Sequence, residues 1–173
     1  MPIRQTGGGQ WTKNAVGGSA QAFSIATDKL DPYSVVLAEE EAGGGHTIRE
    51  HVAVTDEALQ DHVRGQMGRW FLWNYGTARG RFFSKEAAND YVNRVLRLNM
   101  TMVDAVVAGS RYEQLIEQRI GSVTGTEAYS DGSFDPIMRS TYSVRVVIRH
   151  DAGTPRGYRV ITAFPMNERK GNQ

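Results

Sequence analysis

The stretches that decide the fold class are Tyr142-Ser-Val-Arg-Val-Val-Ile-Arg149 and Tyr158-Arg-Val-Ile-Thr-Ala-Phe164. In the first stretch, large apolar side chains stand at every second position, which is the period of a half-buried strand. Residues 150–157 between the two are turn formers, and Pro165 is expected to end the second stretch. The pair predicts an antiparallel hairpin at the centre of a small sheet, to which residues 113–128 are expected to add a strand.

Short helical patterns lie far upstream of this hairpin. Residues 34–41 predict a helix that the three glycines 43–45 end. Thr47 with Glu50 three positions later has the form of a capping box, which predicts a second short helix over 47–54.

Two longer helices are predicted between these elements and the hairpin. The segment 55–67 begins with a Thr-Asp cap, and its Leu59 and Val63 share one apolar face. Ser84 caps the clearest helix, which is expected to bend near Asn99 and end at Gly109. The aromatic residues of segment 70–75 are expected in the core, with base stacking as the alternative. Helices first and strands last indicate an α+β domain.

The composition excludes several classes of protein. The chain has 173 residues and no cysteine, so disulfides, thiolate nucleophiles and Cys-based zinc sites are absent. No apolar run approaches the length of a membrane span, and the first nine residues lack the apolar segment of a signal peptide. Residues 1–33, rich in Gly, Ser, Gln and Asn, are expected to form a flexible lead-in, and residues 34–173 the folded domain.

The charge is balanced overall but divided along the chain. The formal net charge is +1. Residues 137–173 hold seven Arg and Lys against two acidic residues, whereas residues 34–60 hold six acidic residues against one Arg. A basic end of this size suits a polyanion such as RNA, and a solvated strand face is the alternative.

His46 stands apart among the four histidines because three glycines precede it and a predicted helix follows it. Glycines permit close approach to a ligand, and a helix N-terminus favours an anion such as a phosphate. A histidine there could exchange protons near neutral pH. The alternative is a histidine in a flexible loop. The spacing of the histidines lacks a zinc-binding pattern, so no metal is expected.

The last strand and the helix over 55–67 contribute further candidates for the functional site. Thr162 and Phe164 are expected to share one strand face with Tyr158 and Val160, so the Thr162 hydroxyl belongs either to the core or to a cleft. Arg64 near the end of its helix is either a solvated residue that complements the helix dipole or an anion clamp.

Three segments in this order resemble the bacterial RNase A-like toxin domain. They are Ala38-Glu-Glu-Glu-Ala-Gly-Gly-Gly-His46-Thr-Ile-Arg-Glu-His51-Val, Thr55-Asp-Glu-Ala-Leu59 and Tyr158-Arg-Val-Ile-Thr162-Ala-Phe164-Pro165. That family forms the C-terminal domains of CdiA-type contact-dependent growth inhibition proteins and related polymorphic toxins. The resemblance covers about residues 34–167.

The resemblance implies a function as well as a fold. It implies an RNase A-like α+β domain without disulfides, in which N-terminal helices pack on a C-terminal antiparallel sheet. It also implies metal-independent RNA cleavage in the cytoplasm of a target bacterium after delivery by the producing cell. The expected partners are RNA and a cognate immunity protein that blocks the site, with no membrane, no cofactor and an otherwise monomeric chain.

The family's catalytic set transfers to this sequence position by position. The resemblance assigns the catalytic histidine to His46, the threonine to Thr162 and the basic residue to Arg64, with Arg49 in reserve. The family's tyrosine position holds Phe164, which cannot donate a hydrogen bond but could stack a base. His51 is either the missing second acid–base group or a packing residue.

In the implied reaction the ribose 2′-OH attacks the neighbouring phosphorus and leaves a 2′,3′-cyclic phosphate. The protein then supplies only proton transfer, alignment and charge stabilisation. Three other functions stay open: another toxin chemistry such as ADP-ribosyl transfer, a non-enzymatic RNA-binding or protein-interaction module, and an inactive toxin that lacks the tyrosine.

Overall fold

The computed structural model describes residues 31–67, 77–132 and 135–168. The chain divides into two units, residues 1–30 and 31–173, and all described residues belong to the second. The aromatic segment 70–75 lies outside the described residues. No helix in the described ranges is long and apolar enough to cross a membrane.

The described residues form an α+β domain, as the sequence predicts. The helices are α1 (Leu37–Ala42), α2 (Thr47–His51), α3 (Asp56–Met67), α4 (Lys85–Leu98) and α5 (Met100–Val107). The strands are β1 (Thr77–Arg81), β2 (Glu113–Arg119), β3 (Gly125–Ser130), β4 (Ile137–Thr141), β5 (Ser143–His150) and β6 (Tyr158–Met166). Segment 113–128, expected to add one strand, contributes parts of two, and β1 and β4 were not expected.

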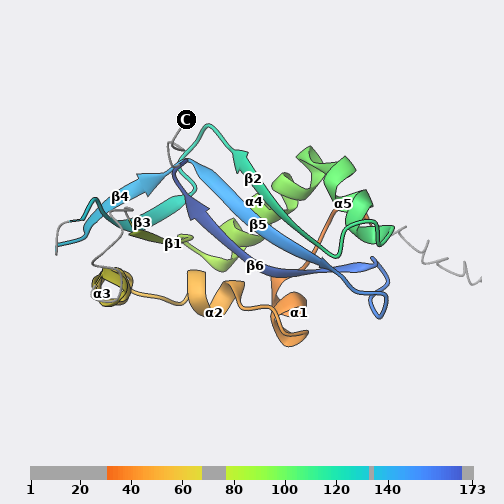
Figure 1. Cartoon of the computed structure of the whole chain (residues 1–173), viewed down its shortest axis with the longest axis horizontal. Coiled ribbons are helices and arrows are strands. Elements are labelled where there is room, and N and C mark those ends of the chain that lie inside the picture. Colours follow the sequence, from red (N-terminus) through yellow and green to blue (C-terminus); the bar gives the residue numbers. More distant parts are fainter. Residues whose placement is uncertain (1–30, 68–76, 133–134, 169–173) are drawn as a thin grey trace, which may run out of the picture. The chain divides into compact units, whose positions relative to one another are not determined.

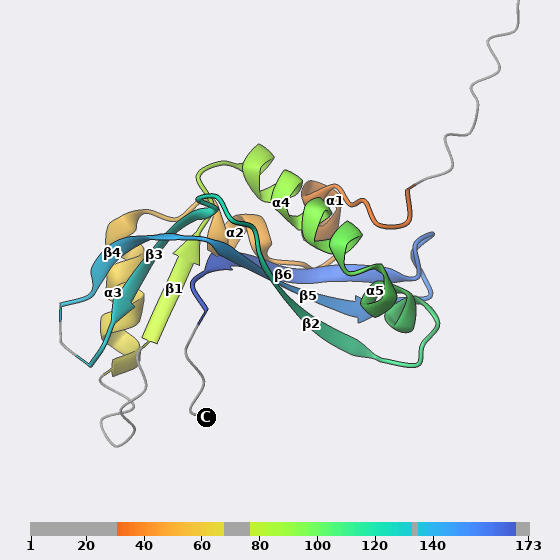
Figure 2. The ribbon, with the colours of Figure 1, turned by 90° about the horizontal axis from the view of Figure 1, so that it is seen from above.

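The predicted hairpin is the core of the first sheet, in which the strand order is β2-β5-β6 and all pairs are antiparallel. The alternating residues Val144, Val146 and Ile148 are fully buried. Helices α4 and α5 cover this face of the sheet (Figure 2). The Ser84 hydroxyl caps α4 by accepting from the Ala87 N–H at 3.1 Å, and Asn99 separates α4 from α5, both as predicted.

A β-bulge in β6 overturns one expectation about side-chain faces. Val147 pairs with Thr162 but Ile148 pairs with Val160, which leaves Ile161 as an extra residue. The extra residue reverses the alternation, so Val160 and Ala163 both face the core. Thr162 and Phe164 therefore do not share a face with Tyr158 and Val160, as the simple period of two predicted. They face away from the core.

The outer edge of β6 is covered by α1, α2 and the loop between them (Figure 1). The buried Glu40 accepts the Val160 N–H at 2.8 Å and pairs with Arg156. Pro165 does not end β6, because the strand continues to Met166 with Pro165 opposite Val144. Proline is tolerated there because β6 lies at the edge of its sheet and Pro165 needs no N–H for the ladder.

The second sheet has the order β1-β3-β4 and is also antiparallel. Helix α3 packs on one of its faces through a small cluster made of Leu59, Val63 and Ala128, all fully buried. The two sheets meet at Gly80 of β1, where a Cβ atom would lie only 2.0 Å from the Pro165 carbonyl oxygen. Only glycine allows that approach.

Candidate functional site

His46 is fixed beside β6 by its backbone. Its N–H donates to the Ile161 carbonyl at 3.0 Å. The preceding Gly45 lies so close to β6 that a Cβ would be 2.8 Å from the Val160 carbonyl oxygen. The glycine thus serves close backbone packing, and His46 is held next to Thr162 rather than in a free loop. The His46 imidazole is partly exposed, and no side-chain hydrogen bond to it is found within the described ranges.

The N-terminus of α2 is not a free anion site, which corrects the sequence-based interpretation. The Glu41 carboxylate accepts the Ile48 N–H at 2.9 Å and the Arg49 N–H at 3.1 Å. The predicted capping box is also wrong, because the Thr47 hydroxyl instead accepts the Ala163 N–H of β6 at 2.8 Å. The acidic segment before the glycines therefore supplies the anion that the helix N-terminus favours.

Thr162 lies on the outer face of the hairpin, opposite Val147. Its hydroxyl is buried and has no hydrogen-bond partner among the described residues. A buried hydroxyl that makes no bond loses free energy, so such a group in a folded protein calls for an explanation. A ligand oxygen that reached Thr162 after a small movement of its neighbours would satisfy it.

Phe164 and His51 form a packed pair near Thr162. Their ring centroids are 4.9 Å apart, and His51 is buried. The His51 Nδ1 lies 2.8 Å from the Gly80 carbonyl oxygen, which can only accept, so Nδ1 carries the proton. Burial, opposed by this hydrogen bond and reinforced by Arg79, lowers the pKa of His51 to about 4. The packing alternative for His51 fits this environment, since an imidazole with so low a pKa is neutral at physiological pH.

Arg64 and Arg49 lie apart from this group. Arg64 is exposed on α3 and pairs with Asp61 one turn earlier at 2.7 Å. Arg49 has 68% of its side chain exposed and lies 3.8 Å from both Glu41 and Glu50. The structure records no contact of either guanidinium with His46 or Thr162 within the described residues.

Arg145 is the cation that sequence reasoning missed at this site. It stands opposite Phe164 in the hairpin, and its guanidinium carbon lies 5.5 Å from the Phe164 ring centroid. Glu117 of β2 holds it by accepting from Nε at 2.7 Å and from one terminal nitrogen. The signal was the alternation itself, which places Arg145 and Arg149 on the face opposite the valines, but the undetected bulge hid which residues of β6 face them.

A second arginine near the site has both of its terminal nitrogens engaged. Arg79 of β1 donates to Glu50 at 3.1 Å through one terminal nitrogen and to His62 at 3.0 Å through the other. Arg145 keeps one terminal nitrogen without a partner in the described part of the chain. Among the described residues no cluster of three His, Asp or Glu has the arrangement of a metal site.

The outer face of the hairpin therefore gathers four features beside α2: the fixed His46, the unbonded Thr162 hydroxyl, the Phe164 ring and the half-buried Arg145. A partly exposed imidazole, a hydroxyl and a guanidinium can together move a proton and bind an oxyanion.

Comparison with known proteins agrees with the fold and the order of these elements. The family model described as "Bacterial CdiA-CT RNAse A domain" matches residues 45–165, which run from the glycine before His46 to Pro165. A crystal structure of a CdiA-CT/CdiI complex from Y. kristensenii has the same fold, with a TM-score of 0.53 and 22% sequence identity, over 70% of this chain and 99% of that chain. No curated protein matches significantly. Since the family model spans well over half of the sequence, the chain belongs to the bacterial CdiA-CT RNase A domain family.

Proposed function

We propose that the chain is a metal-independent ribonuclease toxin that cleaves RNA by transphosphorylation at the outer face of the β5–β6 hairpin. The observation that carries the proposal is that the backbone N–H of His46 is bonded to Ile161 of β6, the residue before Thr162, whose buried hydroxyl has no partner among the described residues. The family match supports the ribonuclease class, and the details of the chemistry rest on the residues at this face.

His46 acts as the general base in this mechanism. It accepts the proton of the ribose 2′-OH, the O2′–P bond forms and the P–O5′ bond breaks. The departing 5′-oxygen takes a proton from water, His46 later gives its proton to solvent, and a 2′,3′-cyclic phosphate remains on the other fragment. Because the substrate supplies its own nucleophile, the protein needs to provide only a base and groups that stabilise the developing charge.

Thr162 and Arg145 bind the phosphate in this mechanism. The Thr162 hydroxyl donates to a non-bridging oxygen, which satisfies its buried and otherwise unbonded atom. Arg145 stabilises the charge on the phosphoryl oxygens, because its guanidinium lies beside Phe164 on the same face. We assign this role to Arg145 ahead of Arg64, the candidate from the resemblance, because Arg145 lies beside Phe164, whereas Arg64 lies exposed on α3 with Asp61 as its partner.

His51 positions Phe164 in this proposal and does not donate the second proton. An imidazole with a pKa of about 4 is almost never in its imidazolium form at neutral pH, so it cannot serve as the general acid, and its one N–H is bonded to Gly80. Phe164 supports the substrate through its ring, next to His51 on one side and Arg145 on another.

The test is incubation of the purified protein with total RNA in the presence of EDTA, beside the His46→Ala variant. We expect fragments that end in 2′,3′-cyclic phosphate with the wild type and a loss of about 10²–10⁴ in rate with the variant. Intact RNA with the wild type would contradict the ribonuclease assignment. Activity that depends on added metal would contradict the mechanism, and full activity of His46→Ala would remove the base.

We also infer a partner and a place of action. The structural neighbour is a complex of CdiA-CT with CdiI, so we propose that a cognate immunity protein binds this chain and blocks its active face. The producing bacterium would deliver the domain of residues 34–173 into the cytoplasm of a target cell. Co-purification with the product of the adjacent small open reading frame, and inhibition of RNA cleavage by that product, test the partner.

A further inference from the structure

We propose that the pocket between the two sheets is a second phosphate subsite, in which Arg139 of β4 binds a phosphate of the RNA next to the scissile one. The inference rests on the ribonuclease function proposed above and extends it to substrate length. It assigns a role to β1, β3 and β4, which the catalytic mechanism leaves without one.

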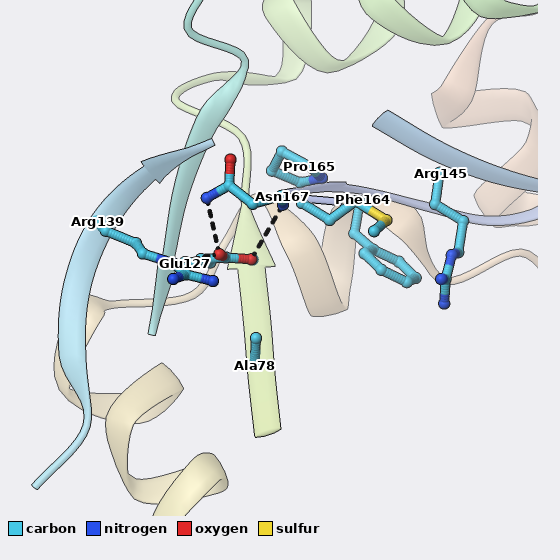
Figure 3. A pocket seen from close by; sticks show the side chains of 9 residues that line it. Ala78, Glu127, Arg139, Arg145, Phe164, Pro165 and Asn167 are labelled. Atoms are coloured by element: carbon cyan, nitrogen blue, oxygen red, sulfur yellow. Dashed lines mark hydrogen bonds and ion pairs between the residues drawn. The ribbon is translucent and has the colours of Figure 1, made fainter. Parts of the chain in front are cut away.

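The pocket joins both sheets and adjoins the catalytic face. Figure 3 shows Arg139 and Arg145 on opposite sides of it, with the Phe164 ring beside Arg145. Its lining residues come from β1, β3, β4, β5 and β6 and from Asn167, which follows β6. Phe164 therefore belongs both to this pocket and to the group around Thr162, so one RNA strand can occupy both places.

Arg139 is held in one orientation but keeps donors free. Its Nε donates to the Glu127 carboxylate at 2.6 Å, and its guanidinium carbon lies 3.6 Å above the Tyr129 ring centroid. Within the described residues, no partner is found for its two terminal nitrogens, and 37% of the side chain is exposed. A stacked guanidinium that is fixed through Nε presents the rest of its donor fork to a phosphate with little further loss of entropy.

Glu127 explains how this orientation is maintained. The carboxylate is 2% exposed, and besides Arg139 it accepts from the Asn167 side chain at 2.9 Å and, at 3.4 Å, from the Asn167 N–H. A buried carboxylate is tolerated only when hydrogen bonds and a cation compensate it. The network thus ties the end of β6 to β3 and β4, and it aims Arg139 at the pocket.

A glutamate holds each of the two arginines of the pocket in the same way. Glu117 binds Arg145 through Nε and one terminal nitrogen, as Glu127 binds Arg139 through Nε. Each glutamate anchors the inner part of a guanidinium whose remaining donors are free within the described structure. Two pre-oriented guanidinium groups on opposite walls suit successive phosphates of one strand better than a single small anion.

The experiment compares substrates of two lengths. A dinucleoside monophosphate carries only the scissile phosphate, whereas a short RNA oligonucleotide also carries a phosphate that can reach the exposed donors of Arg139 at the pocket. For Arg139→Gln we expect kcat/KM on the oligonucleotide to fall about tenfold, the size of a charge-assisted hydrogen bond. The value on the dinucleotide should stay the same, and the salt dependence on the oligonucleotide should weaken by about 0.7 in the logarithmic slope.

Two further variants keep the test interpretable. Arg97→Gln removes a cation of α4 whose partner is Asp31, and it should change the cleavage of neither substrate. If Arg139→Gln lowers the melting temperature strongly, Tyr129→Leu retains the Glu127 ion pair and removes only the stacking ring. It should show the same length-selective loss at smaller size.

The outcomes separate this proposal from the proposed function. Equal losses on both substrates, or none on either, overturn the subsite. If Arg139→Gln leaves RNA cleavage intact but weakens binding of the immunity protein, the pocket is a protein-docking surface and the RNA subsite is wrong. A wild-type protein that cleaves neither substrate refutes the ribonuclease function itself, which the dinucleotide arm reports independently.

Discussion

The two sheets of this domain differ in how they are stabilised and in the role that we propose for each. The β2-β5-β6 sheet lies on a continuous core shared with α4 and α5, whereas the β1-β3-β4 sheet rests on the cluster of Leu59, Val63 and Ala128 under α3. The first sheet carries the proposed catalytic group, and the second contributes one wall of the pocket. The comparison teaches that the roles we propose fall on sheets of different packing: the catalytic group lies on the sheet with the larger apolar core, and the second phosphate subsite draws on the sheet with the smaller one.

The largest expected effect is on the stability of the β1-β3-β4 sheet, which has the smaller apolar core. Leu59→Ala truncates the largest fully buried side chain between α3 and the second sheet, which we expect to cost about 2–5 kcal/mol of unfolding free energy. Because the second sheet has few other apolar contacts, its amides should lose hydrogen-exchange protection before those of β5 and β6. Equal loss of protection in both sheets would show that they unfold as one unit. Val123→Ala, at a partly exposed position, is the control and should change little.

The next effect distinguishes the two candidates for the cation that binds the scissile phosphate, Arg145 of β5 and Arg64 of α3. We expect Arg145→Gln to lower kcat by about 10²–10³, the usual size for loss of one donor to a developing charge. Arg64→Gln, on the helix that covers the second sheet, should stay near wild type because its partner Asp61 is also exposed. Steady-state cleavage of a dinucleotide measures both, and the reverse ranking would return the role to Arg64.

The same comparison shows how far sequence patterns reach. The hairpin was predictable because burial of one face alone imposes a period of two on Val144, Val146 and Ile148. Strands β1 and β4 were not, because Thr-Ala-Arg-Gly-Arg and Ile-Met-Arg-Ser-Thr show no apolar alternation: their arginines meet carboxylates, as Arg81 meets Asp56 and Arg139 meets Glu127.

The residues of the candidate site also differ in whether a local sequence pattern could identify them. Local chemistry singled out His46, and the resemblance added Thr162, but the role of Gly45 was misread because its close contact with the backbone of β6 exists only in the folded structure. Arg145 was missed since one extra residue at Ile161 decides which side chains share its face. A bulge leaves no composition signal in a strand of apolar residues, so no local pattern could have placed Arg145 beside Phe164.

His51 links the two sheets, and its pKa makes that link sensitive to acid. Its Nδ1–H donates to Gly80 of β1, and its ring packs on Phe164 of β6. The pKa is lowered from 6.5 in the unfolded chain to about 4 in the fold, so the unfolded state binds a proton first as the pH falls. Above pH 6.5 His51 is neutral in both states and does not affect the free energy of unfolding. As the pH falls from 6.5 to 4, protonation of the unfolded state lowers that free energy by up to about 3 kcal/mol.

His51→Asn isolates this effect. The asparagine amide can still donate near the Nδ1 position but does not titrate, so the unfolding free energy of the variant should fall less steeply between pH 6.5 and 4. Denaturant unfolding at several pH values measures both proteins. Parallel pH profiles would mean that the carboxylate ion pairs, and not His51, cause the acid sensitivity.

The smallest expected effect concerns the residue that both regions share. Phe164 lines the pocket and also packs beside the catalytic group, at the position where the family resemblance places a tyrosine. Phe164→Tyr adds one hydroxyl to a partly exposed ring, and a new hydrogen bond to a phosphate oxygen is worth about 1–1.5 kcal/mol. We therefore expect kcat on a dinucleotide to rise by up to about tenfold, with KM little changed, because the bond would form most strongly in the transition state.

Phe164→Leu is the matched control, since it keeps an apolar side chain but removes the ring that contacts His51 and Arg145. It should lower activity and raise the exposure of His51, and so raise the pKa of that imidazole toward its ordinary value. If Phe164→Tyr is slower than the wild type while Phe164→Leu is unaffected, the ring does not face the reacting phosphate. Phe164 would then belong to the wall between the two sheets alone, and the catalytic group would consist of His46, Thr162 and Arg145 without an aromatic member.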